Sequence, residues 1–203
     1  MTMTRFHLLF LLLVLALAVP FATADTINLT NNNLGIVGSI GTVTLTQQGG
    51  GVMVTLSANA GYTFKTQGGD ILFNTNVSLN AGSISQITIN GNSYGGSFGF
   101  GGPATRAGST FSYNFSNLNP HGVQSAKTIS FFISGVTVKQ LELANQNGAM
   151  WGVHFCVGDG TKCGVNTGFA TGKFTTVPEP GTLSLLGTGL AGLAGVFRRR
   201  FRS

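Results

Sequence analysis

Apolar and polar residues alternate in short stretches along the middle of the chain. Residues 42–46 read Thr-Val-Thr-Leu-Thr, and residues 111–115 read Phe-Ser-Tyr-Asn-Phe. A period of two is typical of a β-strand that buries one face and exposes the other to water. Gly135 interrupts one such stretch and is expected to form a bulge. The expected strands cover residues 42–46, 52–57, 71–79, 87–89, 111–116, 131–138, 151–156 and 169–175.

Residues that favour turns separate these stretches. Residues 25–177 contain 26 Gly, 19 Thr, 16 Asn and 13 Ser, and their apolar residues are rich in Val, Ile and Phe. Turn formers between β-branched and aromatic stretches indicate many short strands. Only residues 139–147 hint at a helix. We therefore expect an all-β body over residues 25–176, built as an antiparallel β-sandwich or jelly roll.

The first 24 residues have the three parts of a secretory signal peptide. Arg5 precedes an apolar run over residues 8–19, and an Ala-Thr-Ala cleavage site ends at Ala24. The run is shorter than the ~20 residues that a membrane-spanning helix needs. We expect a signal helix that is cleaved off between Ala24 and Asp25, and the alternatives are an uncleaved anchor or a buried helix.

The last 27 residues, 177–203, form a second signal in three parts. Pro178, Glu179 and Pro180 come first, and an uncharged, largely apolar run over residues 182–197 follows. This run is marginal for a membrane span, although flanking Arg side chains can reach toward the interface. We expect a transmembrane helix there, followed by a cytoplasmic stop under the positive-inside rule. That stop is formed by four arginines: Arg198, Arg199, Arg200 and Arg202.

These three parts, in this order at the end of the chain, resemble the PEP-CTERM sorting signal of bacterial exported proteins. The resemblance covers about residues 177–202. It implies recognition by a membrane protease of the exosortase class and removal of the tail. It also implies a transient stage in the inner membrane before delivery to the cell surface or beyond. Such proteins often accompany exopolysaccharide and biofilm production. A plain membrane anchor is the alternative interpretation.

The basic residues are concentrated at the end of the chain. The formal net charge is +6, but residues 25–177 carry six Lys and Arg against four acids, while residues 178–203 carry four Arg and one Glu. A nucleic-acid-binding body needs clustered Lys and Arg, so nucleic acid is not an expected partner. Charged residues make up only 8% of the chain. Such a surface is expected to interact with neutral polar partners, polysaccharides included.

The chain has two cysteines, Cys156 and Cys163. An even cysteine count in an exported protein favours a disulfide, and the Gly-Asp-Gly at 158–160 permits the turn between them. The alternative is a metal site completed by His154 and His121, but structural zinc sites usually have more closely paired ligands. Asp159 is expected to belong to the turn rather than to a calcium site, because calcium requires several carboxylates. We expect neither a metal nor a cofactor.

The sequence offers little support for catalysis. Its acidic residues are scattered, so no pair stands out as a glycosidase pair. The chain also lacks a Gly-x-Ser-x-Gly nucleophile elbow. Cys156 lies two residues from His154, but its expected disulfide competes with a nucleophilic role. We therefore expect a protein that is not an enzyme, and the alternative is a hydrolase whose site is assembled from distant residues.

Two features suggest contact with a ligand. The Gly-rich segment over residues 91–102 carries Tyr94, Phe98 and Phe100, which are candidates for stacking on sugar rings, although a mobile loop or an irregular edge is the favoured interpretation. The threonines of 42–46 share one strand face, as an ice-binding surface requires, but an ordinary solvated face is favoured because no repeat extends the array. Trp151 is expected in the core rather than at a ligand site.

Taken together, these patterns predict a non-enzymatic exported bacterial protein that is sorted to the cell envelope or extracellular matrix. The resemblance of the tail adds a link to exopolysaccharide and biofilm. The alternative function is a polysaccharide- or ice-binding module.

Overall fold

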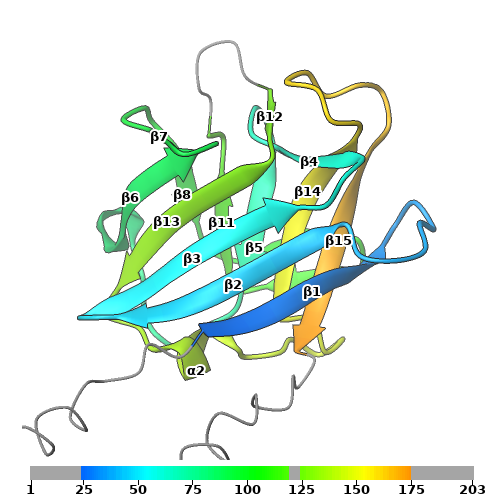
Figure 1. Ribbon diagram of the computed structural model, residues 1–203. Helices are drawn as coiled ribbons and strands as arrows, with labels where there is room; N and C mark the ends of the chain where they lie inside the picture. The colour runs from blue at the N-terminus through cyan, green and yellow to red at the C-terminus, as the bar shows by residue number, and fades with distance from the viewer. Residues whose placement is uncertain (1–23, 119–123, 175–203) are drawn as a thin grey trace, which may run out of the picture.

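A computed structural model of the chain describes residues 24–118 and 124–174. The described part is mostly β-strand (Figure 1). Its strands and short helices run as follows: β1 Ala24–Asn32, β2 Gly41–Gln48, β3 Gly51–Ala58, β4 Tyr62–Lys65, β5 Asp70–Phe73, η1 Ala81–Ser83, β6 Ile84–Ile89, β7 Asn92–Ser93, β8 Gly99–Gly101, β9 Ala104–Arg106, β10 Ser109–Phe111, β11 Tyr113–Ser116, β12 Ser125–Ala126, β13 Thr128–Ser134, α2 Val138–Leu141, β14 Trp151–Val157 and β15 Thr167–Phe174.

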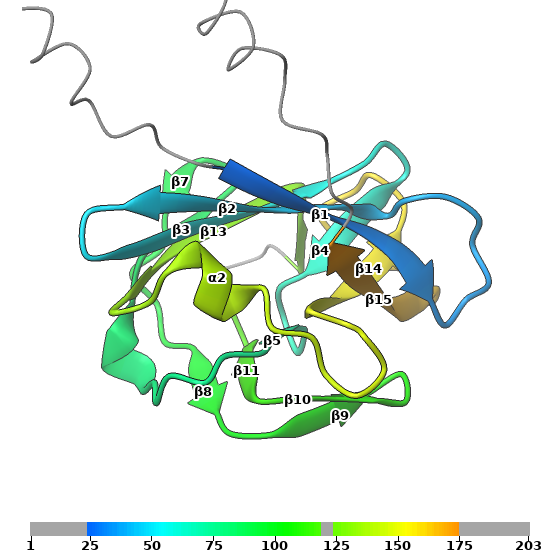
Figure 2. The same cartoon turned by 90° about the horizontal axis from the view of Figure 1, so that it is seen from below.

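Thirteen of the strands belong to one antiparallel sheet. The main order is β7-β6-β13-β3-β2-β1-β15-β14-β5-β11-β8, with β4 paired to both β14 and β12. The sheet curls so that β7, β6, β13, β3, β2 and β1 form the first layer and β5, β11 and β8 form the second (Figure 2). The expected antiparallel all-β fold is confirmed, but its two layers belong to a single curled sheet. The separate hairpin β9–β10 lies below the second layer (Figure 2).

The curl is made where β1, β15 and β14 meet. A Cβ atom added at Gly172 of β15 would lie 2.5 Å from Ile27 Cγ2 and 2.8 Å from the Asn28 carbonyl oxygen. A side chain at this position would therefore force β1 and β15 apart. Glycine lets the two strands approach closely at the turn of the sheet, so the hydrogen-bonded ladder continues from one layer into the other.

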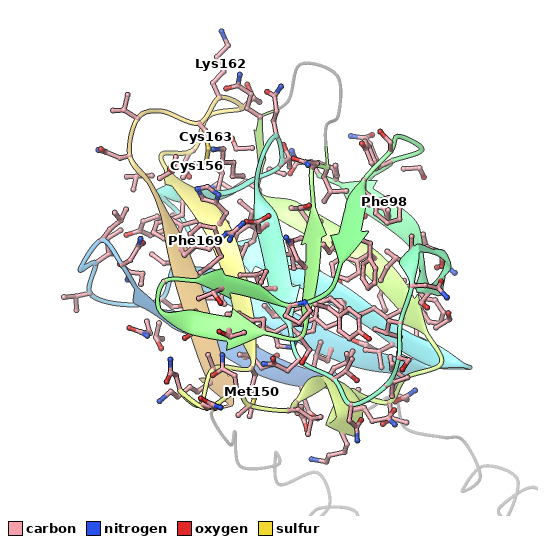
Figure 3. The ribbon with its side chains drawn as sticks, turned by 180° about the vertical axis from the view of Figure 1, so that it is seen from behind. Phe98, Met150, Cys156, Lys162, Cys163 and Phe169 are labelled. Carbon is pink, nitrogen blue, oxygen red and sulfur yellow. A yellow bond between two sulfur atoms is a disulfide. The ribbon has the colours of Figure 1, made fainter. Side chains whose placement is uncertain are left out.

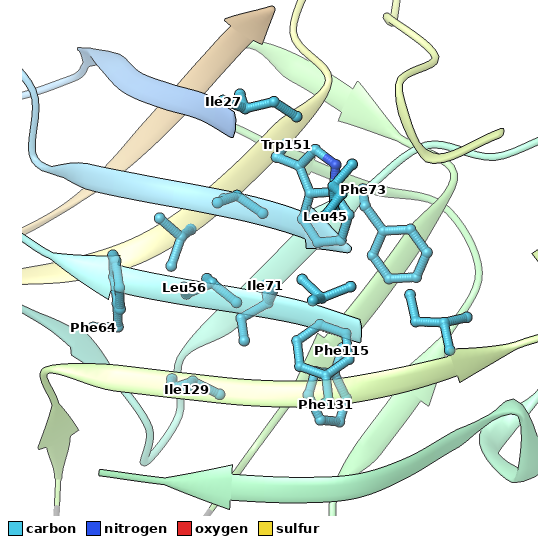
Figure 4. Close-up of a cluster of buried hydrophobic side chains, with 14 of the residues drawn as sticks. Ile27, Leu45, Leu56, Phe64, Ile71, Phe73, Phe115, Ile129, Phe131 and Trp151 are labelled. Carbon is cyan, nitrogen blue, oxygen red and sulfur yellow. The ribbon is translucent and has the colours of Figure 1, made fainter. Parts of the chain in front are cut away.

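The core fills the space between the two layers (Figure 4). Trp151 is fully buried, as its apolar surroundings predict; its ring stacks on Phe73 with centroids 5.0 Å apart. Its indole nitrogen donates to the Leu141 carbonyl at 2.9 Å, which satisfies the one polar atom of the ring. The largest side chains with almost no exposure are Trp151, Phe64, Phe73, Phe111, Phe115, Phe131 and Phe155.

Several expected elements differ in extent from those observed. The predicted strand 71–79 ends at Phe73, because the side-chain carboxamide nitrogen of Asn74 donates to the carbonyl oxygens of Ala149 and Met150 and holds the chain out of the ladder. The helical hint over 139–147 reduces to the four residues of α2. After α2 the Asn145 carboxamide oxygen accepts from the Asn147 and Ala149 amides, which replaces helical bonding by a turn.

The expectation of a bulge at Gly135 is wrong. Gly135 has a φ of +75° and lies in the turn after β13, which ends at Ser134. The irregularity of this strand lies instead on its β6 side, where the register shifts between Ser130 and Phe132. Gln86 of β6 has a positive φ of 52° there, and a residue in this conformation is a usual component of a bulge.

No helix among the described residues is long and apolar enough to cross a membrane. The expected transmembrane segment 182–197 lies outside the described residues, and so does the expected signal helix apart from its last residue, Ala24. Ala24 begins β1, opposite Thr46 of β2.

Candidate functional site

The predicted disulfide is confirmed. Cys156 lies in β14 and Cys163 in the loop toward β15, with their Cα atoms 5.4 Å apart. Figure 3 shows the pair in the upper part of the molecule, above Phe169. The Cys156 sulfur is therefore bonded and cannot act as a thiolate nucleophile in this oxidised state.

Asp159 is the centre of the turn between the two cysteines. Its carboxylate accepts the Gly61 amide at 2.8 Å and pairs with the Lys127 ammonium. Lys127, by its hydrogen bond, lowers the pKa of Asp159. The Lys127 ammonium also donates to the Tyr62 carbonyl at 2.6 Å. Asp159 lies in the turn, as expected, and it also ties the disulfide loop to the turn before β4.

His154 belongs to a cluster on the outer face of β5, β14 and β15. Its ring stacks on Phe169 at 4.4 Å, and the Arg106 guanidinium lies 5.9 Å from the centre of the Phe169 ring. Arg106 Nε in turn donates to the Asp70 carboxylate at 2.8 Å. Burial, followed by the charge of Lys65, lowers the pKa of His154 to about 4. The imidazole is therefore neutral at pH 7, and its buried Nδ1 has no hydrogen-bond partner among the described residues.

This cluster fastens a hairpin to the sheet. Arg106 is in β9, while Asp70, His154 and Phe169 lie in three strands of the sheet. Next to them Leu72, Phe111 and Ala149 form a second, smaller apolar cluster between the hairpin and the sheet. The contacts of Arg106 with Asp70 and Phe169 thus hold the hairpin against the sheet.

Among the described residues, no three His, Cys, Asp or Glu side chains come together as metal ligands.

The fold brings together one pair of acids that the sequence separates by more than 100 residues. Asp25 of β1 lies next to Glu142, which follows α2. Burial, and after it the neighbouring Asp25, raises the pKa of Glu142, while Lys139 opposes this by pairing with the carboxylate at 3.1 Å. Glycosidase carboxyls need room between them for a sugar ring or a water. Neither acid lines the hollow beside the β9–β10 hairpin, the hollow beside Cys163 or the hollow beside Tyr94.

The three aromatic residues of the Gly-rich segment are half-buried. The Phe98 ring packs edge-on against the buried Phe115 at 5.1 Å, and the Phe100 ring stacks on Tyr113 at 5.4 Å. Tyr94 also packs against the core and donates its hydroxyl to the Ser97 carbonyl at 2.7 Å. Phe98 and Phe100 thus contribute to core packing, whereas Tyr94 lines a surface hollow with β3, β6, β7 and β13.

A hollow of about 650 Å³ lies between the β9–β10 hairpin and the segment after α2. Its three asparagine side chains are already engaged within the fold. Asn145 donates to the Thr110 carbonyl at 3.0 Å, Asn147 donates to the Gly108 carbonyl at 2.7 Å, and Asn74 accepts from the Ser112 amide at 3.1 Å. These bonds tie the two loops together, so the hollow is a seam between structural segments.

The outer face of the first layer carries a row of hydroxyl groups. Six residues from six adjacent strands lie directly opposite one another in the ladder, and all six are serines or threonines. Five of them are half-buried and the sixth is exposed. We call this set the hydroxyl row: Ser93 of β7, Thr88 of β6, Ser130 of β13, Thr55 of β3, Thr44 of β2 and Thr26 of β1.

A second set lies beside the hydroxyl row. Asn28, Thr42, Ser57 and Thr128 follow one another across β1, β2, β3 and β13. The sequence indicated only the threonines of 42–46. The residues that lie opposite these threonines in the sheet come from strands up to 86 residues away from Thr44. They could not be predicted from the sequence, because the sequence of one strand does not specify its register with another.

The C-terminal tail carries a different kind of signal, which comparison with known proteins identifies. Residues 176–200 match the PEP-CTERM protein-sorting motif. The match confirms the resemblance of the tail and includes Pro178, Glu179 and Pro180. A PEP-CTERM motif marks an exported protein that is sorted to the cell surface through an exosortase, a membrane protein that recognises the motif. The motif lies outside the described residues.

No curated protein matches the chain at the level of sequence, and no solved structure matches it.

Proposed function

We propose that this chain is a non-enzymatic protein of the cell envelope or extracellular matrix, sorted there through its PEP-CTERM motif and associated with exopolysaccharide. The observation that carries the proposal is the sorting motif at residues 176–200, which follows a disulfide-bonded β body. A disulfide suits an oxidising compartment outside the cytoplasm. The expected signal peptide over residues 1–24 supplies the route of export.

Two observations support a body that is not an enzyme. Three of its four acids pair with a basic side chain: Asp70 with Arg106, Asp159 with Lys127, and Glu142 with Lys139. The fourth, Asp25, lies next to Glu142 and does not line any of the three hollows described above. His154 is packed between neighbours rather than facing a cleft.

The sorting step is tested by the intact mass of the exported protein. In cells with an active exosortase we expect the mature chain to start at Asp25 and to lack Arg198 to Arg202. Replacing the motif by Pro178→Ala, Glu179→Ala and Pro180→Ala should leave the tail in place, and Thr175→Ala, which leaves the motif intact, serves as the matched control. A retained Arg tail in the unaltered protein contradicts the proposed sorting.

The second candidate function is a module that binds polysaccharide or ice. The observation that favours it is the hydroxyl row, which presents uncharged hydrogen-bonding groups across six strands. The two ligands are separated by tests of glycan retention and of ice recrystallisation, each with the protein released from cells.

A further inference from the structure

We propose that the outer face of the first layer is a binding surface for an uncharged polysaccharide chain, and that the hydroxyl row is its track. This inference rests on the proposed function, since it names the ligand class and the surface behind the association with exopolysaccharide. It is carried by four features of that face: its hydroxyl groups, its hollow, its lack of charge and its twist.

The hydroxyl row supplies both donors and acceptors. Each Ser or Thr hydroxyl has one donor hydrogen and two acceptor lone pairs, and these are the groups that pair with sugar hydroxyls. Thr55 Oγ1 and Ser130 Oγ lie 3.2 Å apart, so the row already forms one hydrogen bond across strands. With neighbouring strands about 4.8 Å apart, the six residues extend over about 24 Å. That length accommodates several sugar units of an extended chain.

A hollow of about 410 Å³ lies at the β6–β7 end of the row. Three residues of the row, Ser93, Thr88 and Ser130, line it together with Tyr94 and Met53. A sugar ring has apolar C–H faces and hydroxyl edges, so it fits a site where the thioether of Met53 adjoins hydroxyl groups. The hollow occurs beside the shifted register of β6 and β13, where a bulge redirects the side chains.

Tyr94 is already held in one orientation. Its amide donates to the Ile87 carbonyl at 2.8 Å, and its hydroxyl donates to the Ser97 carbonyl at 2.7 Å. A fixed ring loses little conformational freedom when a ligand packs against it, which favours affinity. Tyr94 is thus the one residue of the three predicted glycan contacts that borders this hollow.

The chemistry of the face favours an uncharged ligand. The side chains of β2, β3 and β13 that point outward are Thr, Ser, Met and Phe, with Gln48 at the end of β2, and none of them is ionisable. The pair formed by Arg106 and Asp70 lies on the opposite side of the molecule, at the β9–β10 hairpin. An acidic polysaccharide would lose water from its carboxylates on the hydroxyl row without gaining a cation there.

The twist of the sheet favours a flexible chain over an ice crystal. Neighbouring strands in a sheet are rotated by about 20–25°, so the six strands of the row rotate by about 100° in total. Figure 1 shows β1, β2, β3, β13 and β6 fanning out in this way. A rigid planar lattice contacts only part of such a surface, whereas an extended polysaccharide can follow it.

The test is retention of the exported protein by uncharged polysaccharides, with cellulose, dextran and galactomannan as the probes and alginate as the anionic comparison. We expect retention on at least one uncharged probe and weaker retention on alginate. Because no charge is involved, retention should not change between about 0.05 and 0.5 M NaCl. Retention by none of the uncharged probes, retention by alginate alone, or inhibition of ice recrystallisation without glycan retention overturns the proposal.

The surface is located with matched variants. Thr44→Val with Thr55→Val removes two hydroxyls and keeps the β-branched shape, and we expect the dissociation constant to rise about tenfold. Thr105→Val with Thr110→Val is the control, because it removes a bonded hydroxyl pair, 2.8 Å apart, from the β9–β10 hairpin on the other side. Equal binding by both variants, with melting temperatures unchanged, contradicts the assignment of the surface.

A third variant serves if the double valine variant does not fold. Thr44→Lys places a long charged side chain within the row, between Thr55 and Thr26, without leaving a cavity, and it is expected to abolish retention. Retained binding by this variant would overturn the proposal. Sorting is read separately from the mass of the exported chain, so a protein that is processed but binds no glycan refutes this inference alone. A protein that binds glycan but keeps its tail refutes the sorting alone.

Discussion

The two outer faces of the curled sheet differ in what covers them. On the outer face of β5, β14 and β15 the β9–β10 hairpin buries Leu72 and Phe111, and Arg106 of the hairpin pairs with Asp70 of the sheet. On the outer face of β1, β2, β3, β13 and β6 the corresponding positions are mostly Thr and Ser, and they remain half-exposed. Figure 2 shows the hairpin on one side of the molecule and the first layer on the other.

The difference shows that the amino-acid composition of a sheet face determines whether another segment covers it. A large apolar side chain gains free energy from burial, so an outward-facing Leu72 or Phe169 favours a covering segment. A Thr or Ser gains little and keeps its hydrogen bonds to water. The covered face therefore contributes to stability, while the open face is available for a ligand.

The largest effect is expected from Phe111→Ala on the covered face. Phe111 is 1% exposed and packs over Gly152 in the second apolar cluster. Its removal leaves a cavity under the hairpin and should lower the free energy of unfolding by about 3–5 kcal/mol. Urea unfolding measures this, and Phe132→Ala on the half-exposed open face should cost about 1 kcal/mol. Equal losses of unfolding free energy for Phe111→Ala and Phe132→Ala would contradict the view that only the covered face contributes strongly to stability.

The disulfide should rank second. Replacing Cys156 and Cys163 by Ala opens a short loop, and the expected loss is about 2 kcal/mol, at the low end for disulfides. Thermal unfolding with and without reductant measures it. Reductant should lower the melting temperature of the unaltered protein and leave that of the variant unchanged. An unaltered protein that is insensitive to reductant would contradict this.

The pH dependence of stability should distinguish the covered face from the open one. The pKa of His154 is about 4 in the folded state, against an ordinary value of 6.5. As the pH falls from about 6.5 to 4, the unfolded chain takes up the proton first, so stability is lost. Because His154 is only half-buried, water screens the effect and the loss should be about 1 kcal/mol.

The measurement is denaturant unfolding at several pH values. His154→Gln should lose about 1 kcal/mol less than the unaltered protein between pH 6.5 and pH 4. Thr44→Val on the open face should retain the full pH dependence, which makes it the control. Parallel curves for the unaltered protein and the His154→Gln variant would show that His154 does not titrate in this window.

The smallest effect on stability is expected on the open face itself. Thr44→Val and Thr55→Val should each change the free energy of unfolding by no more than about 0.5 kcal/mol, since their hydroxyls are half-exposed and bond to water in the unfolded chain. Melting temperatures by circular dichroism check this. A loss above about 1 kcal/mol at either position would show that the hydroxyl row is part of the structural framework.

The strands that could be predicted are those whose two faces differ in polarity. Residues 42–46 and 52–57 became β2 and β3 because their apolar residues fill the core, and the 151–156 stretch became β14 for the same reason. The strand β1 was missed although Ile27 and Leu29 alternate with polar residues. The short strands around 99–111 contain mainly Gly, Ala, Ser and Thr, so they lack a strong pattern.

The predicted site residues had different outcomes. The cysteines form their disulfide because only seven positions separate them and the Gly-Asp-Gly turn closes the loop. Of the three aromatic residues, Phe98 and Phe100 pack on Phe115 and Tyr113 of β11. Nothing in the sequence of the Gly-rich segment indicates that it contacts this strand. The cluster of His154, Phe169 and Arg106 was not predicted, since its members lie in three separate strands.

The sequence by itself determined the features that depend on nearby residues. These are the period-two strands, the disulfide across a tight turn and the tail that matches the PEP-CTERM motif. Only the tertiary structure decided that six hydroxyl residues from six strands form one row, and that one face is covered while the other is open. The physical reason is that register and curl depend on hydrogen bonding between strands far apart in the chain, and no local pattern encodes it.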